Sequence, residues 1–448
     1  MGKRVAVVGA GLAGTEAAWQ LAQRGYEVSL HEMRPNRLTP AHQTGLAGEM
    51  VCSNSFKSDD PASATGILKA ELTRLDSLVL HAARIHRVPA GLSLAVDREA
   101  FARELTEALQ KHPKITWIEG VVSAPDPETP TLLASGPLTD EGLASWMTDH
   151  LGQRRLFFYD AIAPIVEAAS IDRSVVFAAS RWGHGEPDFL NCPLDRDAYE
   201  AFVDALLAAP KAALHDDVTP FFEACLPIEV MAERGRETLR FGPMKPVGLD
   251  DPRTGRRPYA AVQLRQDTLA ADHYNLVGFQ TRLTWGAQAE VFRSIPGLEQ
   301  AAFARFGSIH CNTYVLVPEV LDVILASRAC PNLWIAGQLS GVEGYLESAA
   351  AGLTTTHSID RTLRHLEPSP FPRETVLGAL LHYLAHAETK HFAPVNAMLG
   401  LLPPLPDGTV DARTAKRAGG ARGLKQARGL AYRERALAAL EAHLGSLS

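Results

Sequence analysis

The sequence predicts an α/β protein in which a Rossmann-type domain with a parallel sheet carries an inserted α/β domain. Short apolar runs alternate with helical patterns through residues 1–150. A glycine-rich turn joins the first apolar run to the first helical pattern, and a second strand–glycine–helix unit follows at 332–353. Alternation of this kind is typical of parallel sheets with right-handed crossovers.

The N-terminal unit is a GxGxxG motif between a strand and a helix. An apolar run at 5–8 precedes it, and Glu32 closes the next strand-like run. In this context the first glycine permits a tight turn, the second lets the backbone approach a pyrophosphate, and the third lets the helix pack against the strand. Glu32 is placed to accept hydrogen bonds from a ribose. The loop expected to hold the phosphates at the helix N-terminus comprises Gly9, Ala10, Gly11, Leu12, Ala13 and Gly14.

The second strand–glycine–helix unit favours FAD over a diffusible nicotinamide cofactor. The first unit would hold the ADP end, and the second would bring its backbone close to the flavin and ribitol. Gly337, Gln338 and Tyr345 are therefore candidate cofactor-binding residues. Tyr345 and His310 lie near glycine-rich or strand-end segments, where a ring can either stack on the flavin or simply pack.

The pattern along the chain divides it into two domains. A helix is expected over 97–111 with Asp97 as its N-cap, followed by a strand at 115–118 and, over 131–137, a strand that ends in a turn of small residues. Aromatic runs and many prolines then replace the alternation between about 151 and 305. We therefore predict an FAD-binding domain formed by 1–150 and 306–448, with basic C-terminal helices, and an insertion domain at 151–305.

Composition sets broad limits on the class of protein. The chain has 448 residues, 46% of them hydrophobic and 21% charged, and a net charge of −7, as in an ordinary globular protein. No apolar run approaches the ~20 residues of a membrane helix, and the first strand begins too early for a signal peptide, so we expect no membrane association and cytoplasmic residence. Five cysteines without a CxxC pair argue against disulfides and a metal site.

Two features stand out beyond the cofactor motif. Cys52 lies in a polar loop, where an exposed reactive thiolate and a small buried side chain are both possible, whereas the apolar neighbours of Cys225 favour burial. The segment 413–433 contains basic residues and no acid. It is either a solvated helix face or a contact for a phosphate backbone. The candidate RNA-binding residues are Arg417, Arg422, Lys425 and Arg428.

Several strings in the chain resemble the folate- and FAD-dependent tRNA (uracil-5-)-methyltransferases of bacteria, which make ribothymidine at position 54 of the T loop. CSNSFKS and LFFYDAIAPIV are specific, and the others are shared with a sister family of longer flavoproteins that modify the wobble uridine. The matching strings are GAGLAGTEAAWQLA at 9–22, HEMRP at 31–35, CSNSFKS at 52–58, LFFYDAIAPIV at 156–166, NCPL at 191–194 and AGQLSGVEGYLESAAAGL at 336–353.

The resemblance implies a specific activity. The protein would bind FAD, take a one-carbon unit from methylenetetrahydrofolate, use NADPH or NADH as reductant, and act on the T loop of tRNA, with no obligate protein partner evident. Cys52 and Cys225 would be the two functional cysteines, and His310 would stack the folate pterin against the flavin.

The chemistry of uracil methylation needs such groups. A thiolate that adds to C6 makes C5 nucleophilic, a reduced flavin can convert a methylene into a methyl group, and a second cysteine can remove the C5 proton. The base must also leave its stack to be reached. Which cysteine attacks and which acts as base stays open, as do three other functions: modification of the wobble uridine, a small-substrate flavin oxidoreductase, and a non-catalytic flavin-binding RNA chaperone.

Overall fold

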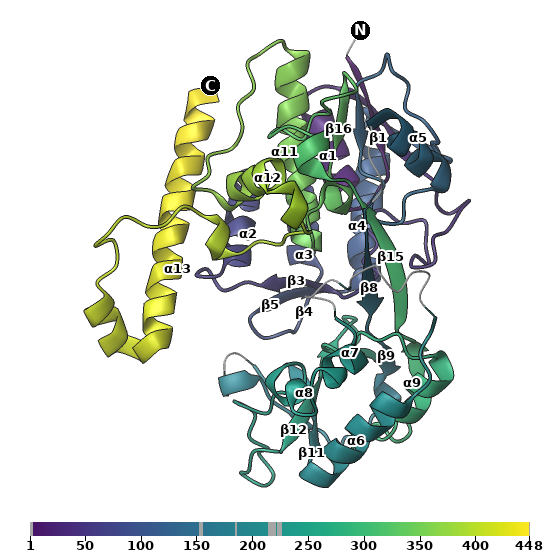
Figure 1. Cartoon of the computed structure of the whole chain (residues 1–448), viewed down its shortest axis with the longest axis vertical. Coiled ribbons are helices and arrows are strands. Elements are labelled where there is room, and N and C mark those ends of the chain that lie inside the picture. The colour runs from purple at the N-terminus through teal and green to yellow at the C-terminus, as the bar shows by residue number, and fades with distance from the viewer. Residues whose placement is uncertain (1–2, 152–155, 184–185, 214–220, 222–225, 448) are drawn as a thin grey trace.

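The computed structural model describes residues 3–151, 156–183, 186–213, 221 and 226–447. Figure 1 shows a larger upper part, which contains both termini, and a smaller lower part, with two long strands between them. Within the described residues, buried side chains form one large cluster that draws on the N- and C-terminal thirds, and a second cluster that runs from Val166 to Ala301. The second cluster lies inside the segment that we assign to an insertion, although the limits 151 and 305 stay a prediction.

The upper part is built on the predicted parallel sheet. Its described strands follow the order β16-β7-β1-β2-β6, and every neighbouring pair is parallel. The segment 131–137 is a short strand that ends in a turn, as predicted, and Gly136 in this turn has φ +74°. The strands of this sheet are β1 (Arg4–Val8), β2 (Glu27–Glu32), β6 (Ile115–Glu119), β7 (Thr131–Leu133) and β16 (Leu333–Ile335).

The two strand–glycine–helix units lie side by side. Helix α1 (Leu12–Gln23) packs closely against α11 (Tyr345–Leu363) through small residues. A Cβ atom on Gly352 would lie 2.1 Å from the carbonyl oxygen of Ala13, so only glycine permits this approach. Both helices follow strands of the same parallel sheet, β1 and β16, so both start on the side where those strands end, as a shared FAD site requires.

The remaining helices of the upper part surround this core. Asp97 caps α4 by accepting a hydrogen bond from the backbone N–H of Ala100, as predicted. These helices are α2 (Ala64–Arg74), α3 (Leu78–Ile85), α4 (Arg98–Lys111), α5 (Glu141–Leu151), α10 (Val317–Val320) and α12 (Val376–His386), with short 3₁₀ turns η4 (Gly337–Ser340), η5 (Thr389–His391) and η6 (Leu399–Leu401).

The lower part is mixed α/β, but its sheet is antiparallel, in the order β10-β11-β12-β13-β9-β14. Its strands are β9 (Ile165–Glu167), β10 (Phe177–Ala178), β11 (Phe189–Leu194), β12 (Ala260–Gln266), β13 (His273–Leu276) and β14 (Phe303–Arg305). Its helices are α6 (Arg196–Ala208), α7 (Ile228–Glu233), α8 (Thr238–Phe241) and α9 (Trp285–Phe292), with 3₁₀ turns η1 (Ala168–Ser170) and η2 (Arg181–Gly183).

Two small sheets link the parts. Strands β8 (Leu156–Ile162) and β15 (Ser308–Tyr314) form an antiparallel pair that runs between them (Figure 1). A three-stranded sheet has the order β3-β5-β4. Its strands are β3 (Ser55–Ser58), β4 (Arg87–Val88) and β5 (Ser93–Val96). The CSNSFKS string thus ends in a strand at the junction of the two parts.

The basic C-terminal segment folds as one long helix, α13 (Ala412–Leu447), broken at Gly419 and Gly420. Beyond the break it packs on the segment leading into α2, because a Cβ on Gly429 would lie 2.1 Å from the Ala62 carbonyl oxygen. Ala436 and Leu440 are fully buried there. Figure 1 shows α13 along one side of the molecule, with its broken end pointing toward the lower part. Among the described helices, none is long and apolar enough to cross a membrane.

A buried acid at the α2–α12 contact makes stability depend on pH. Glu71 is fully buried and accepts the backbone N–H groups of Val376 and Leu377 at 2.7 and 2.9 Å. Burial raises the pKa of Glu71 from 4.5 to about 7, against the lowering effect of these two hydrogen bonds. The folded state therefore holds this proton more tightly than the unfolded chain, and the resulting stabilisation is complete below the unfolded pKa and lost as the pH rises through about 7.

We predict that Glu71→Gln flattens this dependence. Between about pH 5 and pH 7.5 the free energy of unfolding of the unmodified protein should fall by ~2–3 kcal/mol more than that of Glu71→Gln, since one pKa unit corresponds to ~1.4 kcal/mol. Urea unfolding at both pH values measures the difference. Parallel curves for the two proteins would contradict it.

Candidate active site

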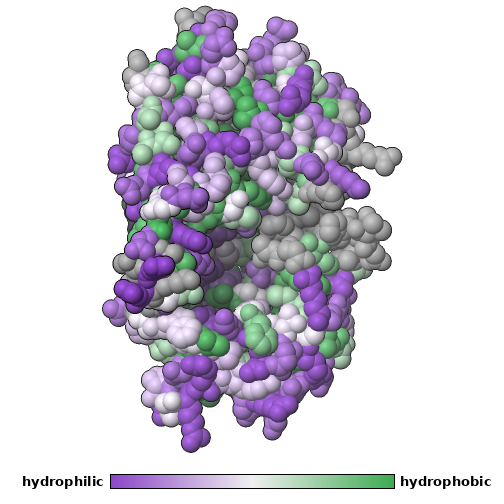
Figure 2. Space-filling view, turned by 60° about the vertical axis from the view of Figure 1, so that its left-hand side comes forward, coloured by the Kyte–Doolittle hydropathy of each residue, from purple (hydrophilic) through white to green (hydrophobic). Residues whose placement is uncertain are grey.

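The predicted cofactor and catalytic segments meet in one cavity of about 410 Å³. The glycine loop, the CSNSFKS string, the second glycine unit and strand β12 of the lower part all contribute to its wall. Figure 2, which looks at the side that carries α13, shows the surface hollowed at mid-height, between the two parts. The candidate residues that line the cavity are Gly9, Gly11, Leu12, Ala13, Glu32, Cys52, Gly337, Gln338 and Tyr345.

The three glycines of the N-terminal loop are needed for different reasons. Gly9 has φ +99°, and a Cβ there would lie 2.5 Å from the Ala134 carbonyl oxygen. A Cβ on Gly14 would lie 1.8 Å from the Gly9 carbonyl oxygen, so the helix could not close on the turn. Gly11 meets nothing within 4 Å and lines the cavity, which leaves space for a ligand at the start of α1.

Glu32 is a buried ion-pair partner as well as a wall of the cavity. Its carboxylate accepts the backbone N–H of Ala10 at 2.7 Å and three N–H groups of Arg34, including Nε at 2.8 Å. Burial raises the pKa of Glu32, but the hydrogen bonds and charge of Arg34 outweigh burial and hold it below its usual value. A ribose hydroxyl would have to share an oxygen with these donors, so the ribose contact of Glu32 stays a prediction.

The second glycine unit lies against the start of α1. Gly337 has φ +73°, and a Cβ there would lie 2.9 Å from Cβ of Ala13. Gln338 donates from Nε2 to both carboxylate oxygens of Glu343, at 3.2 and 3.1 Å. Backbone and side chains of this unit thus lie against the glycine loop, in the place expected for the flavin end of FAD.

Tyr345 connects the cofactor side of the cavity to Cys52. Its hydroxyl oxygen accepts the backbone N–H of Cys52 at 2.7 Å and that of Ser53 at 3.3 Å. Burial and the nearby Cys52 raise the pKa of this phenol, so it stays neutral. Tyr345 therefore fixes the backbone that carries the thiol, and its stacking on a flavin stays a prediction.

Cys52 is half-buried and faces positive charge. Its Sγ lies 3.5 Å from the carbonyl oxygen of Ala161 and lines the cavity. The buried Arg265 and the half-buried Arg305 interact electrostatically with it, and burial lowers the pKa of Arg265 to about 10. The thiol that a nucleophilic step would use therefore lies beside two guanidinium groups.

The CSNSFKS string is held at both ends. The fully buried Asn54 donates from Nδ2 to the carbonyl oxygens of Val96 and Gln266, each at 3.0 Å, and accepts Nε of Arg265 at 2.9 Å. At the other end, Nζ of Lys57 forms an ion pair at 2.9 Å with the buried Glu347 of α11. The string thus ties the two parts of the molecule together around the cavity.

These anchoring residues were missed at the level of sequence. Asn54 and Lys57 lie in the CSNSFKS string, but the string does not indicate which of its side chains form hydrogen bonds or ion pairs with other segments of the chain. Arg265 gave no signal, because an arginine in a strand is recognised as buried only once the neighbouring part is in place.

Some predicted residues cannot be placed in the cavity. Cys225 lies outside the described residues, and so does the side chain of His310, whose backbone forms part of β15 opposite Asp160. Of the other cysteines, Cys192 is fully buried, which raises the pKa of its thiol, and Cys330 is half-buried. Among the described residues, no group of three or more His, Cys, Asp or Glu side chains could hold a metal ion.

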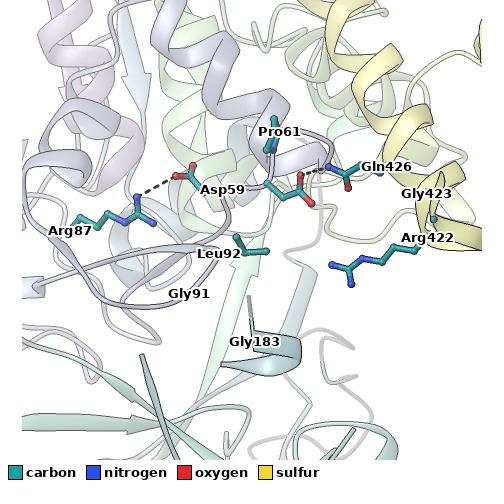
Figure 3. A pocket seen from close by; sticks show the side chains of 11 residues that line it. Asp59, Pro61, Arg87, Gly91, Leu92, Gly183, Arg422, Gly423 and Gln426 are labelled. Carbon is teal, nitrogen blue, oxygen red and sulfur yellow. Dashed lines mark hydrogen bonds and ion pairs between the residues drawn. The ribbon is translucent and has the colours of Figure 1, made fainter. Parts of the chain in front are cut away.

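The four basic candidates are exposed on α13 (Arg417, Arg422, Lys425 and Arg428). Arg422 lines a second cavity, of about 670 Å³, outside the first one, and Figure 3 shows its side chain extending from α13 over that opening. The basic segment is therefore a surface feature, separate from the cavity that holds Cys52.

Fold and cavity together define a Rossmann-type flavoprotein. The glycine loop, the open position at Gly11 and the adjoining second glycine unit fit an FAD with its ADP end at α1. Solved structures with this fold include GidA of Aquifex aeolicus, with a TM-score of 0.69 over 99% of this chain and 76% of that one, at 16% identity.

Sequence comparison identifies the family of flavoproteins to which the chain belongs. The family model described as "Glucose inhibited division protein A" matches residues 4–367. A methylenetetrahydrofolate–tRNA-(uracil-5-)-methyltransferase TrmFO of Desulforudis audaxviator is 52% identical, with 98% of each chain covered. The enzyme of the same name from Enterococcus faecalis is 49% identical over 91% of this chain and 94% of its own. The chain belongs to the GidA-related flavoproteins and, among them, to the TrmFO family.

Proposed function

We propose that this protein methylates C5 of a uridine in tRNA, with methylenetetrahydrofolate as one-carbon donor, FAD as bound cofactor and NADPH or NADH as reductant. The observation that carries the proposal is the single cavity in which the dinucleotide loop and Cys52 meet. The names of relatives about half identical over nearly the whole chain support it. The resemblance of CSNSFKS points to uridine 54 of the T loop, and a tRNA substrate implies residence in the cytoplasm.

Each part of the cavity has a role in this reaction. The glycine loop binds the ADP end of FAD, which when reduced supplies the hydride that converts a methylene into a methyl group. Tyr345 holds the Cys52 backbone, and Arg265 and Arg305 place positive charge beside its thiol. Cys52 then either adds to uracil C6 or removes the proton from C5, with Cys225 in the other role. His310 is the candidate for stacking the folate pterin.

The position of Cys52 implies that the uridine must leave its stack. The thiol is half-buried in a cavity between the two parts of the molecule, where a base inside a folded T loop could not reach it. We therefore expect the base to be extruded into the cavity during the reaction.

A direct assay tests the proposal. The purified protein is incubated with undermodified tRNA, methylenetetrahydrofolate labelled in its methylene group, and NADPH. Label is expected in 5-methyluridine at position 54 after nuclease digestion, and the protein as purified should show flavin absorbance. Absence of label from uridine C5 would overturn the proposal.

The wobble uridine is the second candidate, because the GidA family model and the GidA structures match the chain. The same labelled tRNA discriminates, since label would then map to the anticodon. A small-substrate oxidoreductase would oxidise NADPH without regard to RNA, and a flavin-binding RNA chaperone would bind tRNA without needing Cys52.

We predict that the basic face of α13 contributes to tRNA affinity. Replacing Arg417, Arg422, Lys425 and Arg428 together by glutamine should weaken binding at moderate salt. It should also flatten the plot of log Kd against log salt by up to about three or four units, because each phosphate contact contributes ~0.9 to that slope. Filter binding at several salt concentrations measures it, with Lys111→Gln on the exposed end of α4 as control. An unchanged slope would mean that these residues of α13 contact solvent and not the tRNA phosphates.

A further inference from the structure

One buried carboxamide in the wall of the catalytic cavity lacks a hydrogen-bond partner. Asn275 of β13 lines the cavity that contains Cys52, and its side chain is only 2% exposed. Among the described residues, its amide Nδ2 finds no acceptor. Buried polar groups are nearly always paired, because a donor without an acceptor loses its hydration without compensation. Asn275 therefore needs an acceptor that the described part of the chain does not supply.

The alternation of side chains along β13 turns Asn275 toward the cavity. Its neighbours Tyr274 and Leu276 belong to the buried cluster of the lower part, so Asn275 lies on the opposite face of the strand. It pairs directly with Arg265 of the antiparallel strand β12, and residues opposite each other share a face of the sheet. Arg265 interacts electrostatically with Cys52. The unpartnered amide is thus on the same wall as the guanidinium group beside the Cys52 thiol.

Another buried asparagine of the same sheet shows how the fold treats a carboxamide that only stabilises structure. Asn191 of β11 is fully buried and does not line the cavity. Its Nδ2 donates to the carbonyl oxygens of Phe177 and Ala179 at 3.2 and 3.0 Å, and its Oδ1 accepts Nε2 of Gln263 at 3.1 Å. The carboxamide inside the lower part is therefore bonded to protein, whereas the one at the cavity wall, Asn275, has an unpaired donor.

The chemistry of a carboxamide indicates the group that it would bind. It presents an N–H donor and a C=O acceptor side by side, and its χ2 torsion is broad, so either can turn toward the cavity. The N3–H of a uracil ring and the carbonyl next to it form the complementary pair. Enzymes that take a base out of its stack read this edge of the base by hydrogen bonds. A carboxamide on the wall beside Cys52 suits that task.

We propose that Asn275 binds the N3–H and carbonyl edge of the extruded uracil and thereby orients the ring toward Cys52. The inference rests on the proposed function, and it adds a residue of the lower part that binds the reacting base. The pterin and the flavin carry a similar edge. The uracil is favoured because its ring must reach Cys52, which Arg265 links to Asn275, whereas the flavin is expected on the upper part.

Asn275→Ala in the flavin-loaded full-length protein tests the proposal. Its kcat/KM for undermodified tRNA should fall by about 10- to 100-fold, the range for loss of one or two hydrogen bonds. KM for methylenetetrahydrofolate and the flavin content per chain should not change. The free energy of unfolding should not fall, because the variant removes a buried donor that has no partner. Asn191→Ala is the matched control, and it should do the reverse, with lower stability and an unchanged kcat/KM.

A modified substrate shows whether the contact is direct. A tRNA with 3-methyluridine at the target position lacks the N3–H. Single-turnover methyl transfer to this tRNA, relative to transfer to uridine, should fall more in the unmodified protein than in Asn275→Ala. Effects of the added methyl group on the ring or on the tRNA are common to both proteins and cancel in this comparison.

Four results would overturn the inference alone. Normal kinetics of Asn275→Ala, or an equal fall in both proteins with the modified tRNA, would mean that Asn275 does not contact the base. A raised KM for the folate alone would assign the carboxamide to the pterin, and loss of flavin would assign it to the cofactor. Absence of methyl transfer by the unmodified protein would instead overturn the proposed function, and the inference with it.

Discussion

Cys52→Ala is expected to lower methyl transfer to tRNA by at least about 10³-fold while FAD stays bound. The large effect follows from losing a group that forms or breaks a bond with the substrate, rather than one that tunes binding. The fold should tolerate the change, because Tyr345 holds this loop through the backbone N–H groups of residues 52 and 53, which alanine keeps. Single-turnover transfer of label from methylenetetrahydrofolate measures the loss.

Cys330→Ala is the matched control, because Cys330 is also half-buried and does not line the catalytic cavity. It should transfer methyl groups at the unmodified rate. Cys52→Ser should be as inactive as Cys52→Ala, since a hydroxyl is a far weaker nucleophile and base than a thiolate. Full activity in Cys52→Ala would remove Cys52 from the mechanism, and loss of flavin from it would mean that the loop had changed shape.

The sequence was sufficient for the cofactor side of the site. Glycine spacing, the flanking strand and helix, and Glu32 at the end of the next strand are local features, and they predicted the turn, the parallel sheet and the cavity wall. The second unit at 332–353 was also readable, because its glycine and small-residue helix form a local pattern. Its packing against α1 then follows from Gly352.

The other side of the site depends on contacts between distant segments. The antiparallel sheet of the lower part, with short strands such as β9 and β10, lacks a periodic pattern long enough to read. The bonds of Asn54 to β12 and of Lys57 to Glu347 join residues more than 200 positions apart. The sequence also could not show whether the Glu32 carboxylate is available to a ribose. Arg34 is only two residues away, but that it donates to both carboxylate oxygens is apparent only in the folded loop.

Gly11→Ala should weaken FAD binding without destabilising the fold. Gly11 precedes α1 with φ −69°, which any residue adopts, and a Cβ there meets no protein atom within 4 Å. The added methyl group would instead enter the space where the pyrophosphate approaches the helix N-terminus. Loss of one charge-assisted hydrogen bond corresponds to ~1.5–3 kcal/mol, so FAD should bind about 10- to 100-fold more weakly.

Gly14→Ala should instead destabilise the fold, so comparing it with Gly11→Ala separates an effect on FAD binding from an effect on folding. Its Cβ would lie 1.8 Å from the Gly9 carbonyl oxygen, so the backbone must move, at a cost of ~1–3 kcal/mol or more in the free energy of unfolding. Flavin absorbance per chain and the melting temperature of the flavin-free protein separate the two effects. Gly286→Ala in α9, which also meets nothing within 4 Å, should change neither flavin content nor methyl transfer. If Gly11→Ala kept its flavin, the pyrophosphate would have to lie elsewhere in the cavity, and the ADP end could not be assigned to α1.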